Sequence, residues 1–323
     1  MRQSPRFYVL LTLVAICAGT ERAQTANLNV NCDKKETIRK ALRLLAATNP
    51  QGPNTIVVSG TCKENIVVQS LDRLTLLTKS GASIRDRSKG TLAVLDIEDA
   101  RSVTVQGLAI QGGDTGVFCG NASVCYLTAN TIQSAVGQQG VGVSNGARAF
   151  LTGNLIQNNT QRGLTVNEGS QVFSSSDTFQ NNVDAAMVAN SGAYVSAVGT
   201  IVQNNGSDGA SGVVATDRST MRLISCTITG SGGDGVTVFR SSEVRFDNYL
   251  GPTTVTGNGG AGVSVADLSF ALFGPSTITG NAGGDVLCTP QFSATRGALT
   301  NIGGGTTNCV EPTNAVSSRK TPD

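Results

Sequence analysis

The stretch Gly140-Val141-Gly142-Val143 decides the fold, because it returns along the chain at a nearly fixed spacing. Related segments begin at positions 163, 212, 235 and 262, and a copy with Ala in place of Gly begins at position 186. The starts at 140, 163 and 186 are 23 residues apart, and the same step joins 212 to 235 and 262 to 285. The remaining steps of 26 and 27 residues indicate short insertions. A period of this size predicts a solenoid.

Each repeat contains three short strands. The second and fourth positions of each segment are mostly apolar, and this alternation is typical of a strand with one buried face. Turn residues such as Ser144-Asn145-Gly146 follow, then a second apolar pair such as Ala149 and Leu151, and later a single apolar residue such as Ile156. Stacking such coils ~4.8 Å apart buries a face that one coil alone leaves exposed. The sequence therefore predicts an all-β, single-stranded parallel β-helix with coils of about 23 residues.

Gly and Asn recur at fixed places in the repeat. We expect the turns between strands to need positive φ, which both residue types tolerate. An Asn also stands four residues before the next copy at Asn159, Asn182, Asn258 and Asn281. Amide side chains stacked in this way hydrogen-bond from coil to coil, so we interpret them as a structural ladder rather than a ligand site.

The first residues have the pattern of an export signal. Arg2 and Arg6 precede an apolar run over residues 7–18, followed by small and polar residues, which predicts a signal peptide over residues 1–23 with cleavage between Ala18 and Ala26. A lipid anchor at Cys17 is the alternative. The run is too short to favour a transmembrane span.

The rest of the chain divides into three parts. Residues 24–54 are expected to cap the solenoid, with an amphipathic helix that begins at Asp33 and buries Ile38, Ala41, Leu42 and Leu45. Residues 55–303 are assigned to the β-helix, and residues 304–323 to a C-terminal loop and a disordered tail.

The eight cysteines, one of which is Cys17 in the predicted signal peptide, fit an oxidising compartment. The pairs placed to form disulfides are Cys32 with Cys62, Cys119 with Cys125, and Cys288 with Cys309. Cys226 is left over and is interpreted as a buried free thiol. A zinc site is the alternative, but the spacings form no paired motif and the chain has no His, so we expect no metal.

The overall charge gives no reason to expect nucleic acid as a partner. The chain has 24 Lys and Arg against 22 Asp and Glu, a net charge of +2. Its 39 Gly and absence of Trp suit a coil rich in tight turns. Nothing in the pattern specifies an oligomeric state.

With its coil repeat, its export signal, its capping helix and turns such as Ile156-Gln157-Asn158-Asn159, the chain resembles secreted right-handed parallel β-helix proteins with the pectate-lyase-like fold. The resemblance covers residues 55–300 and implies a right-handed solenoid. Many proteins of this fold act on acidic polysaccharides, but the fold alone does not carry a function. The Gly-His-Gly element and clustered aspartates of polygalacturonases are missing, and no specific enzyme family matches.

One outward-facing strip is the candidate carbohydrate-binding surface. Aromatic and charged side chains are expected to point outward from the second strand of successive coils, where rings stack on sugars and Arg pairs with uronate carboxylates. The candidates are Phe150, Phe173, Tyr194, Arg222, Glu243 and Arg245. The alternatives are a face covered by another chain segment or partner, or solvated charges in which Glu243 pairs with an Arg.

Two catalytic interpretations remain open. A polysaccharide lyase would use Arg222 or Arg245 as its base, with a calcium ion held by acidic residues such as Asp208, Asp217 and Asp234. Calcium is expected only in this case, and otherwise no cofactor. A hydrolase would need two carboxylates, for which Glu168, Asp217 and Asp267 share one position of the repeat.

We therefore predict an exported β-helix protein of the extracellular space, periplasm or cell envelope that binds polysaccharide without evident catalysis. An enzyme acting on acidic glycans, with lyase chemistry favoured, and a structural or adhesive solenoid are the alternatives.

Overall fold

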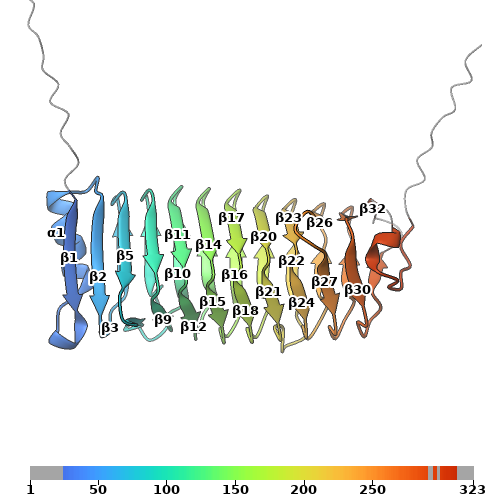
Figure 1. Ribbon diagram of the computed structural model, residues 1–323, viewed down its shortest axis with the longest axis horizontal. Coiled ribbons are helices and arrows are strands. Elements are labelled where there is room, and N and C mark those ends of the chain that lie inside the picture. Colours follow the sequence, from blue (N-terminus) through green and yellow to red (C-terminus); the bar gives the residue numbers. More distant parts are fainter. Residues whose placement is uncertain (1–24, 290–293, 297–298, 311–323) are drawn as a thin grey trace, which may run out of the picture.

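The computed structural model describes residues 25–289, 294–296 and 299–310. They form an elongated solenoid in which each coil contributes strands to three sheets (Figure 1). Successive coils pair in parallel, as between β11 and β14, β12 and β15, and β13 and β16. The predicted parallel β-helix is confirmed.

We name the sheets A, B and C. Sheet A contains β1 (Ala26–Asn31), β2 (Asn54–Ser59), β5 (Leu74–Thr78), β8 (Val103–Gln106), β11 (Val124–Thr128), β14 (Arg148–Thr152), β17 (Gln171–Ser175), β20 (Tyr194–Val198), β23 (Thr220–Ile224), β26 (Glu243–Asp247), β29 (Phe270–Phe273) and β32 (Ala294–Arg296). Sheet B contains β3 (Thr61–Lys63), β6 (Ser83–Arg85), β9 (Ala109–Gln111), β12 (Thr131–Gln133), β15 (Leu155–Gln157), β18 (Thr178–Gln180), β21 (Ile201–Gln203), β24 (Thr227–Thr229), β27 (Thr253–Thr256) and β30 (Ser276–Thr279). Sheet C contains β4 (Ile66–Gln69), β7 (Leu95–Glu98), β10 (Thr115–Gly120), β13 (Gln139–Val143), β16 (Arg162–Val166), β19 (Met187–Ala189), β22 (Val213–Ala215), β25 (Val236–Val238), β28 (Val263–Val265) and β31 (Val286–Cys288).

The core is a set of in-register columns of apolar side chains that run along the solenoid axis. One column, from sheet C, has no exposed surface in any of its members: Val117, Val141, Leu164, Met187, Val213, Val236 and Val263. Burying a side chain of this size contributes about 1.5–3 kcal/mol. Because every coil places its apolar residues on the neighbouring coil, the stack is stable where a single coil would not be.

Glycine serves two different purposes in the repeat. Gly169, in the turn after β16, has a φ of +66°, as the turn chemistry predicts. Gly163, in β16 itself, has no positive φ; a Cβ there would lie 2.6 Å from the carbonyl oxygen of Ala186 in the next coil. The motif glycine is therefore required by close approach of two backbones, a reason that differs from the predicted one.

The predicted Asn ladder is confirmed. Asn159 Nδ2 donates to Asn182 Oδ1 at 2.8 Å, and Asn182 Nδ2 donates to Asn205 Oδ1 at 2.8 Å. Further along, Asn258 Nδ2 donates to Asn281 Oδ1 at 2.8 Å. All five side chains are buried, so these bonds satisfy polar groups that would otherwise be costly to enclose.

The N-terminal end is capped by α1 (Ile38–Thr48), which buries Ile38, Ala41, Leu42 and Leu45 as predicted. The helix does not begin at Asp33. That residue lies in a short 3-10 turn (Cys32–Lys34), which ends where Lys35 takes a φ of +67°, and Thr37 then caps α1. Strand β1 was also not expected; its alternating sequence pairs with β2 and adds a strand to sheet A.

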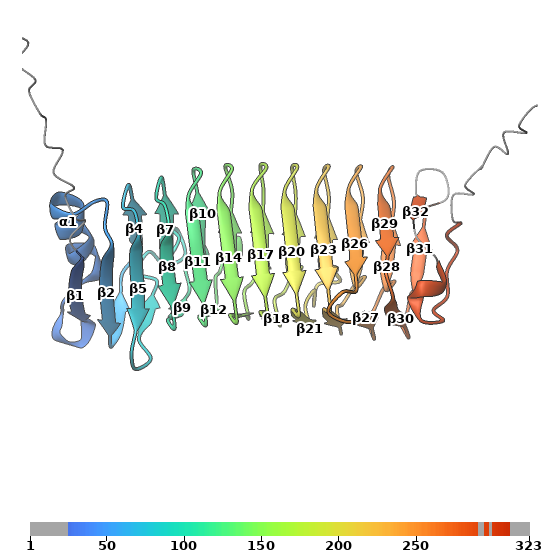
Figure 2. The same cartoon turned by 45° about the horizontal axis from the view of Figure 1, so that its top comes forward.

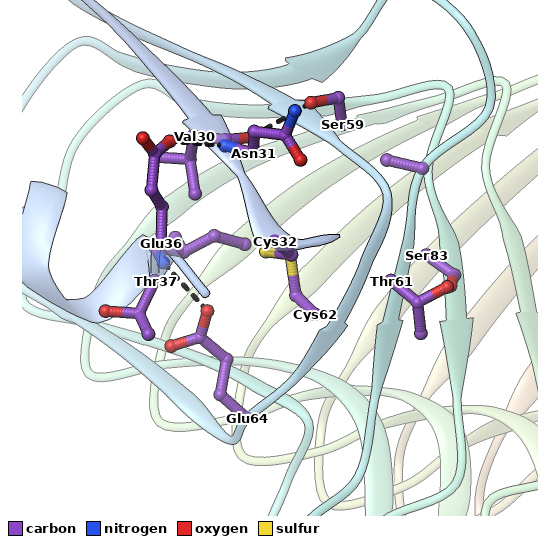
Figure 3. The surroundings of a disulfide bond; sticks show 12 residues. Val30, Asn31, Cys32, Glu36, Thr37, Ser59, Thr61, Cys62, Glu64 and Ser83 are labelled. Carbon is purple, nitrogen blue, oxygen red and sulfur yellow. Dashed lines mark hydrogen bonds between the residues drawn. A yellow bond between two sulfur atoms is a disulfide. The ribbon is translucent and has the colours of Figure 1, made fainter. Parts of the chain in front are cut away.

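A disulfide joins this cap to the first full coil (Figure 3). Cys32 is bonded to Cys62, and nearby Glu64 accepts hydrogen bonds from the backbone N–H of Ile38 at 2.7 Å and of Arg39 at 3.2 Å. The buried carboxylate of Glu64 thus binds the positive end of the helix dipole. A side chain from β-helix residues fixes where α1 begins.

The other predicted disulfides are also present, joining Cys119 to Cys125 and Cys288 to Cys309. Cys226 is a buried free thiol, and burial raises its pKa to about 11. None of the helices among the described residues has the length and apolarity needed to cross a membrane. The signal peptide predicted over residues 1–23 and the end of the tail, residues 311–323, lie outside the described residues.

Candidate functional site

The outer face of sheet A brings the predicted strip together. Parallel register aligns Tyr126, Phe150, Phe173, Ser196, Arg222 and Arg245 in one column. The strands that carry them, β11 to β26, lie side by side in Figure 2. In each strand, the residues before and after the column position are buried in the core. The side chains of the column itself therefore point outward. Six strands at ~4.8 Å spacing give a strip about 24 Å long.

The aromatic half of this strip is a stack of rings. Tyr126 and Phe150 have ring centroids 5.0 Å apart and planes 10° apart, and Phe150 and Phe173 are 5.2 Å apart at 14°. Tyr194 extends the stack, tilted by 54° at 5.9 Å from Phe173. Because the stacked rings of Tyr126, Phe150 and Phe173 cover one another's faces, mainly their edges are left for a ligand. The expected stacking of sugars on ring faces is therefore limited to the ends of the stack and the tilted Tyr194.

The charged half of the strip is organised by Asp247. Its Oδ2 accepts a hydrogen bond from Nε of Arg222 at 2.7 Å and forms an ion pair with Nη2 of the same side chain, also at 2.7 Å. A hydrogen bond to Tyr194 and these bonds to Asp247 raise the pKa of Arg222 above its usual range. A base must release its proton readily, so this environment does not favour Arg222 as the base of a lyase.

Arg245 is held less tightly. Its Nε lies 3.9 Å from both Glu243 Oε1 and Asp247 Oδ1. This one atom is buried and has no hydrogen-bond partner. About 42% of the Arg245 side chain is exposed. Of the two arginines, Arg245 is the one whose guanidinium is available to an anionic ligand. The charge pair predicted between Glu243 and an Arg is present, although at a long distance.

The acidic residues considered for calcium have separate partners. Asp217 pairs with Arg240 at 3.5 Å, Asp208 accepts from the N–H of Ala210, and Asp234 accepts from the N–H of Ala261. The geometry does not bring these three carboxylates together. In the described part of the chain, the grouping of possible metal-ligating atoms is Cys32, Cys62 and Glu64, two of which form a disulfide.

The hydrolase candidates occupy solvated turns. Glu168, Asp217 and Asp267 all have positive φ, near +50°. Glu168 reaches to the adjacent coil, where Ser144 Oγ and the N–H of Asn145 donate to its Oε2. These contacts are those of turn residues that join neighbouring coils.

Two residues of the strip were not identified from the sequence. Tyr126 starts the aromatic stack, and its position 24 residues before Phe150 was the available signal. Asp247, which binds Arg222, lies two residues after Arg245 on the same face, and simple strand alternation would have found it.

A family model described as a right-handed beta helix region matches residues 93–250. A cell surface glycoprotein of Methanothermus fervidus is 30% identical over 138 residues, which are 42% of this chain. The match covers 22% of that glycoprotein, so the chain corresponds to a small part of it.

Solved structures share the fold at low identity. A tailspike protein of an Escherichia coli O157:H7 bacteriophage has a TM-score of 0.61 at 10% identity, over 75% of this chain and 38% of the tailspike. The A-module of a mannuronan C-5 epimerase from Azotobacter vinelandii scores 0.53 at 11% identity, over 85% and 93%. The pectate lyase Pel9A also scores 0.53 at 11%, over 90% and 82%. At these identities the similarity establishes the fold alone.

Proposed function

This chain is a right-handed parallel β-helix protein with a pectate-lyase-like fold, and from that premise we propose that it binds polysaccharide of the cell envelope through the outer face of sheet A. The observation that carries the proposal is the in-register column of three rings and two arginines, which Tyr194 joins from the neighbouring outward position of β20. A straight, regular strip suits a ligand that is itself extended and repetitive.

The chemistry of the strip favours an acidic polymer. Ring edges carry the positive part of the aromatic quadrupole, and the partly exposed guanidinium of Arg245 lies further along the same strip. The tyrosine hydroxyls of Tyr126 and Tyr194 add hydrogen-bonding groups to the strip. Carboxylates and hydroxyls of a uronate chain are complementary to such a surface.

The comparisons support the choice of ligand class and location. Alginate epimerase and pectate lyase are the names of proteins that share this fold, and the partial relative is a cell surface glycoprotein. Three disulfides in the described chain fit an oxidising compartment outside the cytoplasm. We propose export on this basis. We propose binding without catalysis because Arg222 is fixed in its charged form and the candidate carboxylates lie apart.

Affinity electrophoresis in gels containing polygalacturonate, alginate or a neutral glucan tests the proposal. We expect retardation by an acidic polymer, lost or strongly reduced in Phe150→Ala and Arg245→Ala. Gln157→Ala is the matched control, since Gln157 lies in β15 on sheet B. Equal retardation of all variants would place binding elsewhere.

The same samples separate binding from cleavage. An increase in ultraviolet absorbance from an unsaturated product, with or without added calcium, would support the lyase alternative instead. If no polymer retards the protein, the ring stack is better explained as packing between coils of a structural or adhesive solenoid.

A further inference from the structure

A pocket of about 780 Å³ lies between α1 and the start of sheet C, on a different part of the molecule from the sheet A strip. Arg39 and Arg43 line it from α1, Arg87 from the loop before β7, and Asp96 from β7. Its volume is within the range of small-ligand sites in proteins.

The arginines of this pocket are positioned but not neutralised. Arg39 Nη2 donates to the carbonyl oxygen of Asn65 at 3.0 Å. Arg43 follows Arg39 by one helical turn, so the two guanidinium groups share a face of α1. Among the described residues, the side chains of Arg43 and Arg87 have no ion-pair or hydrogen-bond partner. Two exposed guanidinium groups are therefore available to an anion.

The loop that carries Arg87 is fixed by a hydrogen-bonded network. The N–H of Arg87 donates to Asn65 Oδ1 at 3.0 Å, and Asp86 accepts from Ser88, Asn65 and the N–H of Gly90. Burial alone would raise the pKa of Asp86, but these hydrogen bonds outweigh it and lower the pKa to about 2. Asn65 contacts both Arg39 and the backbone of Arg87, so one residue sets the spacing of the two sides of the pocket.

The remaining lining is unlike that of a simple phosphate site. Asp96 Oδ1 is buried and has no hydrogen-bond partner, so it is an acceptor without a donor. Burial and the neighbouring Glu98 raise the pKa of Asp96 to about 6. Val67 and Leu92 remain 55% and 58% exposed at the same pocket. A ligand that fits must bring hydroxyl donors and an apolar face together with its negative charge.

We propose that this pocket binds a uronic-acid unit of an acidic saccharide. Arg43 and Arg87 pair with the sugar carboxylate, Asp96 accepts from its hydroxyl groups, and Val67 and Leu92 contact the C–H face of the ring. An inorganic phosphate would meet the arginines but would leave the apolar surface of Val67 and Leu92 unused. The site does not depend on the sheet A strip, so it stands or falls independently of the proposed function.

Isothermal titration of the purified protein with a short oligogalacturonate tests this assignment. We expect Arg43→Gln and Arg87→Gln each to weaken binding about ten-fold or more, because each removes a charge-assisted hydrogen bond. The fully methyl-esterified oligomer, which has the same rings without the charge, should bind more weakly by a similar factor. Circular dichroism verifies that each variant is folded.

Two controls separate this pocket from other sources of binding. Arg218→Gln removes an exposed arginine in the turn before β23 and should leave the affinity unchanged, whereas Phe150→Ala measures how much of the heat comes from binding at the sheet A strip. The assignment is overturned if the oligomer does not bind, if the Arg43 and Arg87 variants bind normally, or if inorganic phosphate binds at these arginines as tightly as the oligomer.

Discussion

The side-chain amide of Asn154 donates a 2.8 Å hydrogen bond to Oδ1 of Asp177, joining two successive coils inside the solenoid. Asp177 is fully buried, and Ser174 Oγ donates to its other oxygen at 2.6 Å. Burial raises the pKa of Asp177, and the hydrogen bonds from Ser174 and Asn154 offset only part of that effect. Asp177 therefore adds a carboxylate to a ladder of side chains whose other members, Asn130 and Asn154, are amides.

This arrangement predicts that Asp177→Asn stabilises the protein at neutral pH. Because the pKa of Asp177 is raised in the folded state, the contribution of this residue to the free energy of unfolding is fully present below its unfolded pKa of about 3.9. That contribution is lost as the pH rises through the folded pKa. Asn keeps the acceptor for Asn154 and has no charge to bury. We expect a gain of about 1–2 kcal/mol at pH 7 that shrinks towards pH 4. Urea unfolding across this pH range measures it.

The control for that prediction is Asp208→Asn, since Asp208 is an exposed carboxylate in a turn. Its unfolding free energy should change by no more than about 0.5 kcal/mol. A loss of stability in Asp177→Asn at every pH would show that the carboxylate itself is required.

Asn182 lies in the middle of the second amide ladder, between Asn159 and Asn205. Asn182→Ala leaves the buried amide of Asn159 without its acceptor and Asn205 Oδ1 without its side-chain donor. We expect a loss of about 3 kcal/mol in the free energy of unfolding. Gln161→Ala, at an exposed site in the same turn region, is the control and should change little. A loss of similar size in both variants would argue against the ladder as the cause.

The close approach at Gly163 predicts a steric effect of a single methyl group. Its Cβ would meet the Ala186 carbonyl oxygen at 2.6 Å, and a backbone atom in a sheet cannot move aside easily. We expect Gly163→Ala to cost about 2–3 kcal/mol. Gly169→Ala meets no atom within 4 Å and should cost about 1 kcal/mol, from its positive φ alone. Thermal unfolding of the two variants compares these effects, and equal shifts would contradict the steric explanation.

From the Cys288–Cys309 disulfide we predict that the last described coil is protected locally from unfolding and amide hydrogen exchange. It closes a loop with a sequence separation of 21, and Asn308 Oδ1 accepts from the N–H of Cys288 at 2.7 Å. Cys309→Ser should destabilise this end by about 3 kcal/mol. Amide hydrogen exchange should then rise in β31 but remain unchanged in β16, which is far along the solenoid. Uniform exchange throughout would mean that the solenoid unfolds as one unit.

The repeat made much of this structure predictable. Three sequence features reflect contacts that recur in every coil: the period of 23 residues, the alternation of apolar residues, and the positions of Asn and Gly. A copy that deviates from the pattern is therefore still assigned correctly from the copies on either side of it. The ends were less predictable. Strand β1 and the start of α1 depend on contacts made once, with β2 and with Glu64.

The candidate sites divide in the same way. Strand register aligned Phe150 with Phe173 and Arg222 with Arg245, as the spacing predicted. The pairing of Arg222 with Asp247, and the turning of ring faces towards one another, depend on side-chain rotamers that the repeat does not encode. The pocket at α1 was not found from the sequence, because Arg43 and Asp96 come from elements 53 positions apart that only the cap brings together.

The sequence by itself determined the solenoid, its strand register, its amide ladder and its cysteine pairs, because each of these follows from spacing along a repeating chain. The tertiary structure alone decided which charges are neutralised and which remain available. Asp247 occupies Arg222, while Arg43 and Arg87 face a pocket without a partner among the described residues. The reason is physical: the energy of a charge depends on burial and on atoms within a few ångströms, and those are known only once the coils and the cap are packed.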